Sequence, residues 1–175
     1  MVSLTSQIVT GTGHGWNILQ GPFLVSESEK QTINSLNYSP AFSIYKDAIE
    51  NESHYSFNDQ NFFDIAKHFP LGIADLNNQL VVRDPILTHD GSIHCVGDIP
   101  VNSMVYLLKG STASLLASAN QAAKSATTKI DGKDFTVTMV FDCISRMLYM
   151  ENSFSQELEL ITKQCSKQIF LVCSL

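Results

Sequence analysis

Charged residues are scarce in this sequence of 175 residues: they make up 16% of it, and the formal net charge is −6. Because a nucleic-acid surface needs a basic stripe to neutralise phosphates, this balance argues against DNA or RNA as a partner. It also leaves an anionic membrane surface nothing to attract. No stretch approaches the roughly 20 apolar residues of a membrane span. The N-terminus MVSLTSQIVTGTGHG has no basic region and no long apolar run, so we expect no signal peptide.

Paired cysteine motifs, internal repeats and low-complexity tracts are missing as well. The four cysteines lie scattered in apolar segments, and none forms a CxxC pair: Cys95, Cys143, Cys165 and Cys173. Buried thiols in a reducing compartment are the simplest interpretation, which predicts a cytoplasmic protein. Gly11-x-Gly13-x-Gly15 lacks the spacing of a phosphate-binding loop, and we interpret its glycines as bends between strands. We therefore expect no cofactor.

Apolar residues, at 44%, are ample for a packed core in one domain of ordinary size or in a large half of a bigger one. Strand-like and helix-like patterns are interleaved along the chain. The order predicts an α+β or α/β fold, in which a mixed, largely antiparallel β-sheet packs with about four helices. Strands are expected within 5–36 and at 79–88, 92–96, 103–108, 135–142 and 168–175; helices are expected at 40–50, 59–67 and 111–126, near 143 and from 153.

Local signals fix several of these elements. Asp90-Gly91 predicts the two-residue turn of a hairpin, and Pro85 in its first arm indicates an edge position or a bulge. Ser111 or Thr112 is expected to cap a helix, and Ser153 with Gln156 forms a capping-box pattern. The expected inner faces are Leu115, Ala119, Ala122 and Ala126 on the first of these helices, and Phe154, Leu158, Ile161 and Cys165 on the second. One strand alternates, with Phe135, Val137, Met139 and Phe141 on one face.

Several stretches, taken in order, carry a resemblance to a known family. They are Gly15-Trp16 with Gly21-Pro22, Ser39-Pro40-Ala41-Phe42-Ser43-Ile44-Tyr45, Phe69-Pro70-Leu71-Gly72 with Leu80-Val81-Val82-Arg83, Asp90-Gly91-Ser92 with Pro100-x-x-Ser103, and Phe141-Asp142-Cys143-Ile144-Ser145-Arg146 with Glu157-Leu158 beyond. Together they resemble the C-terminal half of the FIST domain, named for F-box and intracellular signal transduction proteins. The resemblance covers nearly the whole chain.

The resemblance implies a bacterial sensory domain that binds small ligands such as amino acids and passes a signal to a separate output domain. Residues 1–36 would be the end of the N-terminal FIST half or linker strands, and residues 37–175 the C-terminal domain, truncated at its end. The expected partners are a small-molecule ligand (an amino acid or small carboxylate), the N-terminal half and the output domain, with a homodimer as a further option. The family's N-terminal half and its glycine- and glutamate-rich ending are absent from the sequence.

The strand-to-helix junction at Asp142, Cys143 and Arg146 is the first candidate ligand site. Free N–H groups at a helix start attract a carboxylate, and Arg146 one turn later is placed to grip it bidentately. Asp142 would then take the ammonium group of an amino acid. The competing interpretation is that Asp142 caps the helix while Arg146 pairs with a surface acid.

Arg83 and Gly72 are the other two candidate ligand-binding residues. Arg83 lies on an otherwise apolar strand, so its guanidinium must either face solvent or have a partner, and a ligand or Asp142 could be that partner. A charge on an edge strand that blocks aggregation explains Arg83 equally well. Gly72 ends the rigid FPLG turn and permits a close backbone approach. Core packing with a helix stop is the favoured explanation of that turn, which would still form a wall of the pocket.

Chemistry and metal binding are weaker hypotheses. Cys143 at a helix start is a candidate nucleophile, but no cysteine-hydrolase signature surrounds it, so we expect no enzyme. With Asp90-Gly91 as the turn, His89 pairs with Ser92 and Leu87 with His94, so Cys95 points to the face opposite the two histidines and no closed zinc site is expected. A protein-interaction or structural half-domain, docking on the N-terminal half or on its own copy, remains the main alternative to the sensor.

Overall fold

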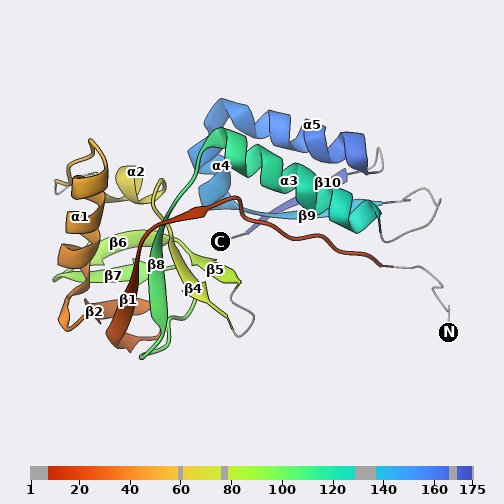
Figure 1. Ribbon diagram of the computed structural model, residues 1–175. Helices are drawn as coiled ribbons and strands as arrows, with labels where there is room; N and C mark the ends of the chain where they lie inside the picture. The colour runs from red at the N-terminus through yellow and green to blue at the C-terminus, as the bar shows by residue number, and fades with distance from the viewer. Residues whose placement is uncertain (1–7, 59–60, 76–78, 129–136, 166–168, 175) are drawn as a thin grey trace. The chain divides into compact units, whose positions relative to one another are not determined.

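The computed structural model describes residues 8–58, 61–75, 79–128, 137–165 and 169–174 (Figure 1). Two compact units divide the chain. The sheet unit is Trp16–Gly110, and the helical unit consists of residues 8–15 together with residues 111–174. The sheet unit is therefore one continuous stretch, whereas the helical unit is assembled from two separate stretches. The predicted α+β class is confirmed.

A curled antiparallel sheet forms most of the sheet unit. Its strand order is β5-β4-β8-β1-β2-β7-β6, with β3 paired to β2. The strands are β1 (Asn17–Glu29), β2 (Thr32–Leu36), β3 (Ser39–Pro40), β4 (Leu71–Ala74), β5 (Leu80–Arg83), β6 (Pro85–His89), β7 (Ser92–Cys95) and β8 (Met104–Lys109). Residues 17–36 thus contribute to the same sheet as the later strands, and the domain boundary after residue 36 stays a prediction.

The predicted hairpin is confirmed in its turn and its register. Asp90 and Gly91 have φ values of 48° and 81°, the left-handed pair that a type I′ turn requires. His89 pairs with Ser92 in the β6–β7 ladder, as expected. The long first arm predicted over 79–88 is divided into β5 and β6, because Pro85 has no N–H with which to continue a ladder. β6 is an edge strand, as the proline indicated.

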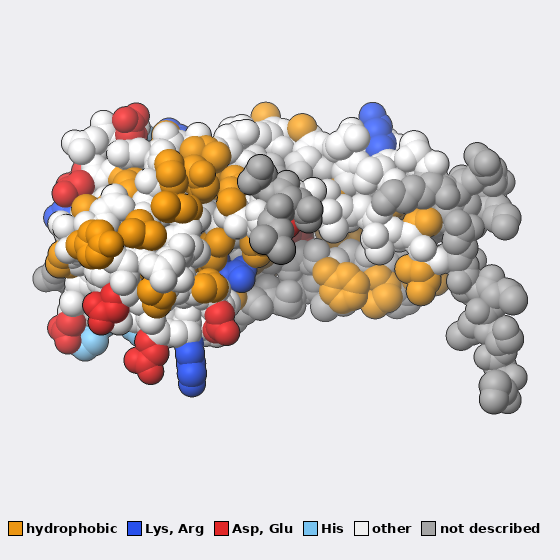
Figure 2. Space-filling view, turned by 60° about the horizontal axis from the view of Figure 1, so that its bottom comes forward, with side chains coloured by type: hydrophobic (Ala, Val, Ile, Leu, Met, Phe, Trp, Pro, Cys, Tyr) orange, Lys and Arg blue, Asp and Glu red, His pale blue; other side chains and the backbone are white. Residues whose placement is uncertain are grey.

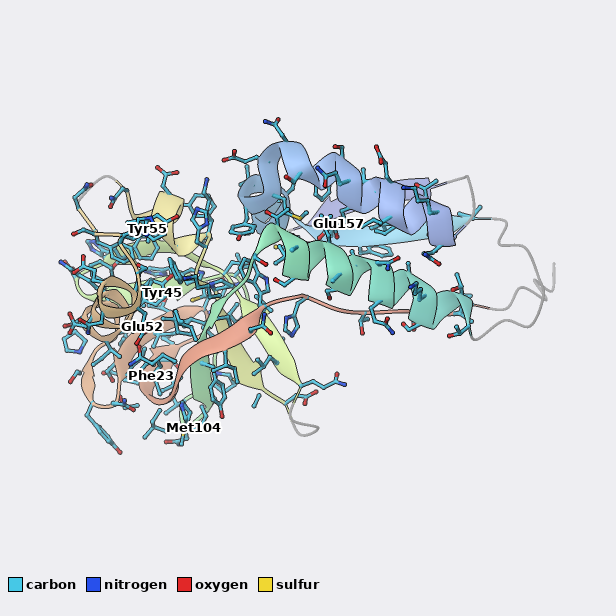
Figure 3. The ribbon with its side chains drawn as sticks, turned by 45° about the horizontal axis from the view of Figure 1, so that its top comes forward. Phe23, Tyr45, Glu52, Tyr55, Met104 and Glu157 are labelled. Atoms are coloured by element: carbon cyan, nitrogen blue, oxygen red, sulfur yellow. The ribbon has the colours of Figure 1, made fainter. Side chains whose placement is uncertain are left out.

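Helices α1 (Ala41–Glu52) and α2 (Phe62–Ala66) belong to the sheet unit. The predicted helix at 40–50 is confirmed, and it buries Ala41, Tyr45, Ala48 and Ile49 at helical spacing. Tyr45 lies within the core, where its hydroxyl donates to the Phe69 carbonyl at 2.8 Å (Figure 3). The second helix is shorter than the predicted 59–67, and residues 59–60 lie outside the described residues.

The helical unit contains α3 (Thr112–Thr127), α4 (Ile144–Met150), the 3₁₀ turn η1 (Glu151–Ser153), α5 (Phe154–Gln164) and the parallel pair β9 (Thr138–Cys143) and β10 (Ile169–Ser174). Helices α3 and α5 lie side by side along the pair (Figure 1). Val140 on β9 packs into their small core, which is formed by Ala119, Ala123 and Ile161. None of the described helices is long and apolar enough to cross a membrane.

Helix α3 starts as the sequence predicts. Ser111 caps it, and Ser114 completes a reciprocal capping box with the Ser111 backbone. Leu115 and Ala119 are buried as expected, but the third buried residue is Ala123, whereas Ala122 and Ala126 are half-buried. Ala123 is buried in place of Ala122 and Ala126 because it belongs to the core that α3 shares with α5.

The capping box predicted at Ser153 is wrong. Ser153 has helical angles (φ −80°, ψ −10°), and its side chain makes no capping bond. The 3₁₀ turn η1 runs directly into α5, so Ser153 already has a helical backbone conformation, whereas an N-cap residue needs an extended one. The buried face of α5 carries Phe154 and Ile161 as predicted and, unexpectedly, Glu157.

Exposed and less exposed side chains alternate as predicted over residues 137–141, from the residue before β9 into the strand, while Phe135 lies outside the described residues. Val137, Met139 and Phe141 are 46%, 58% and 70% exposed, so the apolar face of this strand points away from α3 and α5. Figure 2 shows hydrophobic side chains gathered in a row along this strand. We call these three side chains the β9 row.

Candidate functional site

The predicted strand-to-helix junction lies in the helical unit, where β9 meets α4. Asp142 is the last residue but one of β9, and Cys143, half-buried, is the N-terminal flanking residue of α4. Ser145 and Arg146 follow in the first turn of α4 and are both buried. Glu157 reaches the same place from α5 (Figure 3). We call Asp142, Arg146 and Glu157 the charge cluster.

Protein oxygens surround the Arg146 guanidinium. Its Nε donates to both carboxylate oxygens of Glu157, at 3.1 and 3.0 Å. Nη1 donates to the main-chain carbonyl of His14 and Nη2 to that of Leu115, both at 2.7 Å. The side chain is only 8% exposed. A ligand carboxylate, the partner that the sequence suggested for Arg146, would have to displace one of these oxygens.

Asp142 is partnered on one oxygen only. Its Oδ1 accepts from the Cys143 N–H at 2.8 Å and lies 3.7 Å from Arg146 Nε. Its Oδ2 and the hydroxyl of Ser145 are buried without a hydrogen-bond partner among the described residues. The Asp142 side chain is 9% exposed. A buried polar atom without a partner costs about 1–3 kcal/mol, so both atoms call for an explanation.

Burial dominates the electrostatics of both acids. Desolvation raises the pKa of Asp142 above its ordinary value, against the opposing effects of Arg146 and of the Cys143 N–H. Desolvation also raises the pKa of Glu157, although its hydrogen bond to Arg146 acts the other way. Two carboxylates therefore share a single guanidinium. With both acids ionised the charge cluster carries one excess negative charge, and it can gain from a further cation.

His14 contacts the charge cluster through Arg146. It precedes Gly15 and α3 in the helical unit, and its carbonyl is held by Arg146. Burial and then the charge of Arg146 lower the pKa of its imidazole from the ordinary 6.5. The environment thus favours a neutral ring.

The structure separates the five predicted ligand-binding residues into two groups. Arg83 and Gly72 lie in the sheet unit, on the adjacent strands β5 and β4, and Asp142, Cys143 and Arg146 lie in the helical unit. Arg83 Nε donates to the carbonyl of Asp98 at 3.0 Å. A Cβ on Gly72 would come within 2.9 Å of the Leu108 side chain, so tight packing in the sheet already explains this glycine.

A shallow depression on the sheet unit contains none of the predicted residues. Its volume is about 560 Å³, and its lining is polar: Glu29, Lys30, Gln31, Thr32, Asn34, His94 and Asp98. The His94 ring is bonded to Thr32 Oγ1 at 2.8 Å. No group of three potential metal ligands is found among the described residues. The charge cluster is therefore the stronger candidate, because it contains unsatisfied buried atoms.

The reactive-thiol alternative gains nothing from the other cysteines. Burial raises the pKa of the Cys95 thiol to about 12, and burial also raises that of Cys165. Both thiols are thereby disfavoured as thiolates. Cys143 itself is half-buried.

Glu157 is the site residue that sequence reasoning missed as the partner of Arg146. The signal was present, since Glu157 lies three residues after Phe154 and four before Ile161, on the apolar face of its helix. A carboxylate on such a face needs a cation. The pairing itself links positions eleven residues apart through η1, a turn that the sequence pattern did not reveal.

Comparison with known proteins agrees with this architecture. Residues 41–174 match the family model of the FIST C domain, and the chain therefore belongs to that family. Membership suggests a sensory domain of signal transduction. Searches among curated proteins and among solved structures gave no significant match.

Proposed function

We propose that this chain is the sensory input domain of an intracellular signalling protein and that it binds a small ligand carrying an ammonium group, such as a free amino acid, without changing it chemically. The observation that carries the proposal is the pair of buried, unpartnered acceptors Asp142 Oδ2 and Ser145 Oγ beside a cluster in which two carboxylates share one guanidinium. Family membership supports the signalling role.

An ammonium group fits these atoms better than a carboxylate does. It offers three donors and a positive charge, which satisfy Asp142 Oδ2 and Ser145 Oγ and balance the second carboxylate of the cluster. A carboxylate would face two acids and an arginine already bonded to protein oxygens. The ammonium end of the ligand is therefore assigned to this junction, and its other end is left unassigned.

Burial of the two acceptors makes ligand entry depend on a local opening between β9 and α4. A ligand that binds one conformation better than another shifts their populations, which is how such a domain would signal. The ligand, an N-terminal FIST half and a separate output domain are the proposed partners. Among the described residues, Cys95, Cys143 and Cys165 form no disulfide, which suits a reducing cytoplasm.

A thermal-shift screen tests the proposal. The twenty amino acids, simple primary amines and small carboxylates are added to the wild type, to Asp142→Asn and to Ser145→Ala, with Arg83→Ala in the sheet unit as the control. A ligand at 100 times its dissociation constant stabilises by about 2.7 kcal/mol. We expect a shift with amino acids or amines that Arg83→Ala retains and Asp142→Asn loses. Stabilisation by carboxylates alone, or a shift retained in Asp142→Asn, would contradict it.

The β9 row favours a second candidate function, a domain that docks on its N-terminal half or on another copy. Paired parallel strands are normally covered on both faces, and α3 and α5 pack on the face of β9 that carries Val140. Val137, Met139 and Phe141 are left exposed. Sedimentation across a hundredfold concentration range, with Phe141→Ser as the comparison, separates the candidates: association that this variant abolishes favours docking on a second copy.

A further inference from the structure

A segment at the start of the helical unit, residues 8–15, runs alongside α3 without regular secondary structure (Figures 1 and 3). We call it the strap. Its glycines face α3 at helical intervals: Gly11 lies against Ala122, Gly13 against Ser118 and Gly15 against Leu115. These helix positions are separated by four and three residues, which places them on one face. The sequence suggested that these glycines make bends between strands, and this interpretation is wrong.

Each strap glycine is there because a Cβ would not fit. A Cβ on Gly11 would collide with the main-chain oxygen of Ala122, which cannot move without distorting α3. A Cβ on Gly13 would come within 2.5 Å of Ser118 Oγ, and one on Gly15 within 2.8 Å of Leu115 Cα. Gly15 also has a φ of +76°, a conformation that other residues rarely adopt. The strap is thus fitted closely to α3, while Gly11 and Gly13 remain exposed on their outer side.

Arg146 joins this strap to the charge cluster. One guanidinium nitrogen bonds the carbonyl of His14 on the strap, and another bonds the carbonyl of Leu115 on α3, at 2.7 Å each. The same guanidinium contacts two acids: Nε lies 3.1 and 3.0 Å from the two carboxylate oxygens of Glu157, and 3.7 Å from Asp142 Oδ1. A shift of Arg146 toward either acid therefore changes its hold on the strap.

We infer that the strap is the element that responds to the state of Asp142, with Arg146 as the connection. Neutralising Asp142 leaves Glu157 as the only charged partner of Arg146 and tightens the strap against α3. Neutralising Glu157 draws the guanidinium toward Asp142 and loosens the strap. The inference rests on the proposed function in one respect: the group that neutralises Asp142 is the ammonium group of the proposed ligand. The strap continues directly into β1 through Trp16.

The two acids give the decisive comparison, because the inference predicts opposite effects for them. Limited proteolysis of the full chain with proteinase K, followed by mass spectrometry, measures the cleavage rate within residues 8–15. We expect cleavage to slow about tenfold in Asp142→Asn and to accelerate about tenfold in Glu157→Gln, each corresponding to about 1.4 kcal/mol. If the charge cluster only stabilised the fold, cleavage would be faster in both variants. That result, or no change in either, overturns the inference.

Folding of the variants is checked by circular dichroism. If Glu157→Gln does not fold, Asp142→Asn alone decides: slower cleavage supports the inference, and unchanged or faster cleavage overturns it. Gly11→Ala and Thr12→Ala form a matched pair in the strap, since Thr12 is exposed and Gly11 lies against Ala122. Cleavage must accelerate in Gly11→Ala relative to Thr12→Ala. Equal rates in these two variants would show that packing on α3 does not hold the strap.

Adding amino acids to the same assay distinguishes the two proposals. An amino acid that stabilises the chain and slows cleavage, as Asp142→Asn does, supports both. Stabilisation without any change in cleavage leaves the proposed function standing and overturns the role of the strap. Opposite effects of the two acid variants, with no amino acid stabilising the chain, support the strap and refute the proposed ligand.

Discussion

Replacing Arg146 with methionine tests how much the charge cluster contributes to the fold. The variant keeps a long apolar stem but removes every guanidinium bond, to Glu157 and to the carbonyls of His14 and Leu115. Two acids are then left buried without their cation. Breaking a buried pair on one side typically costs about 3–5 kcal/mol. At about 2–4 °C per kcal/mol for a chain of this size, the melting temperature should fall by roughly 6–20 °C.

Two comparisons make this result interpretable. Arg83→Met removes an arginine whose guanidinium donates to the main-chain carbonyls of Asp98 and Val82, so its cost should be smaller, about 1–2 kcal/mol. The double variant Arg146→Met/Glu157→Leu also removes one of the two orphaned acids and should recover at least half of the loss. Differential scanning calorimetry measures all three. The reasoning is refuted if Arg146→Met costs no more than Arg83→Met, or if the double variant is less stable than the single one.

Three further results are expected. The pKa values of Asp142 and Glu157 are raised in the folded chain, so the folded chain still holds protons that the unfolded chain releases near pH 4. The contribution of these two acids to stability therefore falls as the pH rises through their folded pKa values. Between about pH 4 and 7 the melting temperature should fall less steeply with rising pH in Asp142→Asn than in the wild type. Tyr45→Phe leaves the Phe69 carbonyl unpaired in the core and should cost about 1–3 kcal/mol by urea denaturation, and no loss would contradict the buried bond. Phe141→Ser, on the exposed β9 row, should change stability by less than about 0.5 kcal/mol, and a larger loss would mean that this face is covered.

The fold class and several local structures could be predicted because their causes are local. The Ser111 cap and the Asp90-Gly91 turn depend on residues within four positions of one another, and both are confirmed. The order of strands in the sheet could not be predicted. β1 lies between β8 and β2, and the pairing of β1 with β8 joins residues at least 80 positions apart, which no local pattern encodes.

The candidate site was predicted in its residues but not in its bonding. The junction at Asp142 and Arg146 follows from a strand that gives way to a helix, and both residues lie there. The partners of Arg146 come from α5, α3 and the strap, and only the tertiary structure brings these together. The exposed β9 row shows the same limit, because alternation defines two faces without saying which one is covered.

The bond from Arg146 to His14 also has a consequence for biosynthesis. It spans 132 positions in sequence, and the whole sheet unit is made between its two ends. On the ribosome the sheet unit, a continuous stretch, has everything needed to fold before Arg146 emerges. The residues that will become the strap cannot bond to Arg146 until residue 146 has been translated. We therefore expect nascent chains halted after Gly110 to contain a folded sheet and an unanchored N-terminal segment.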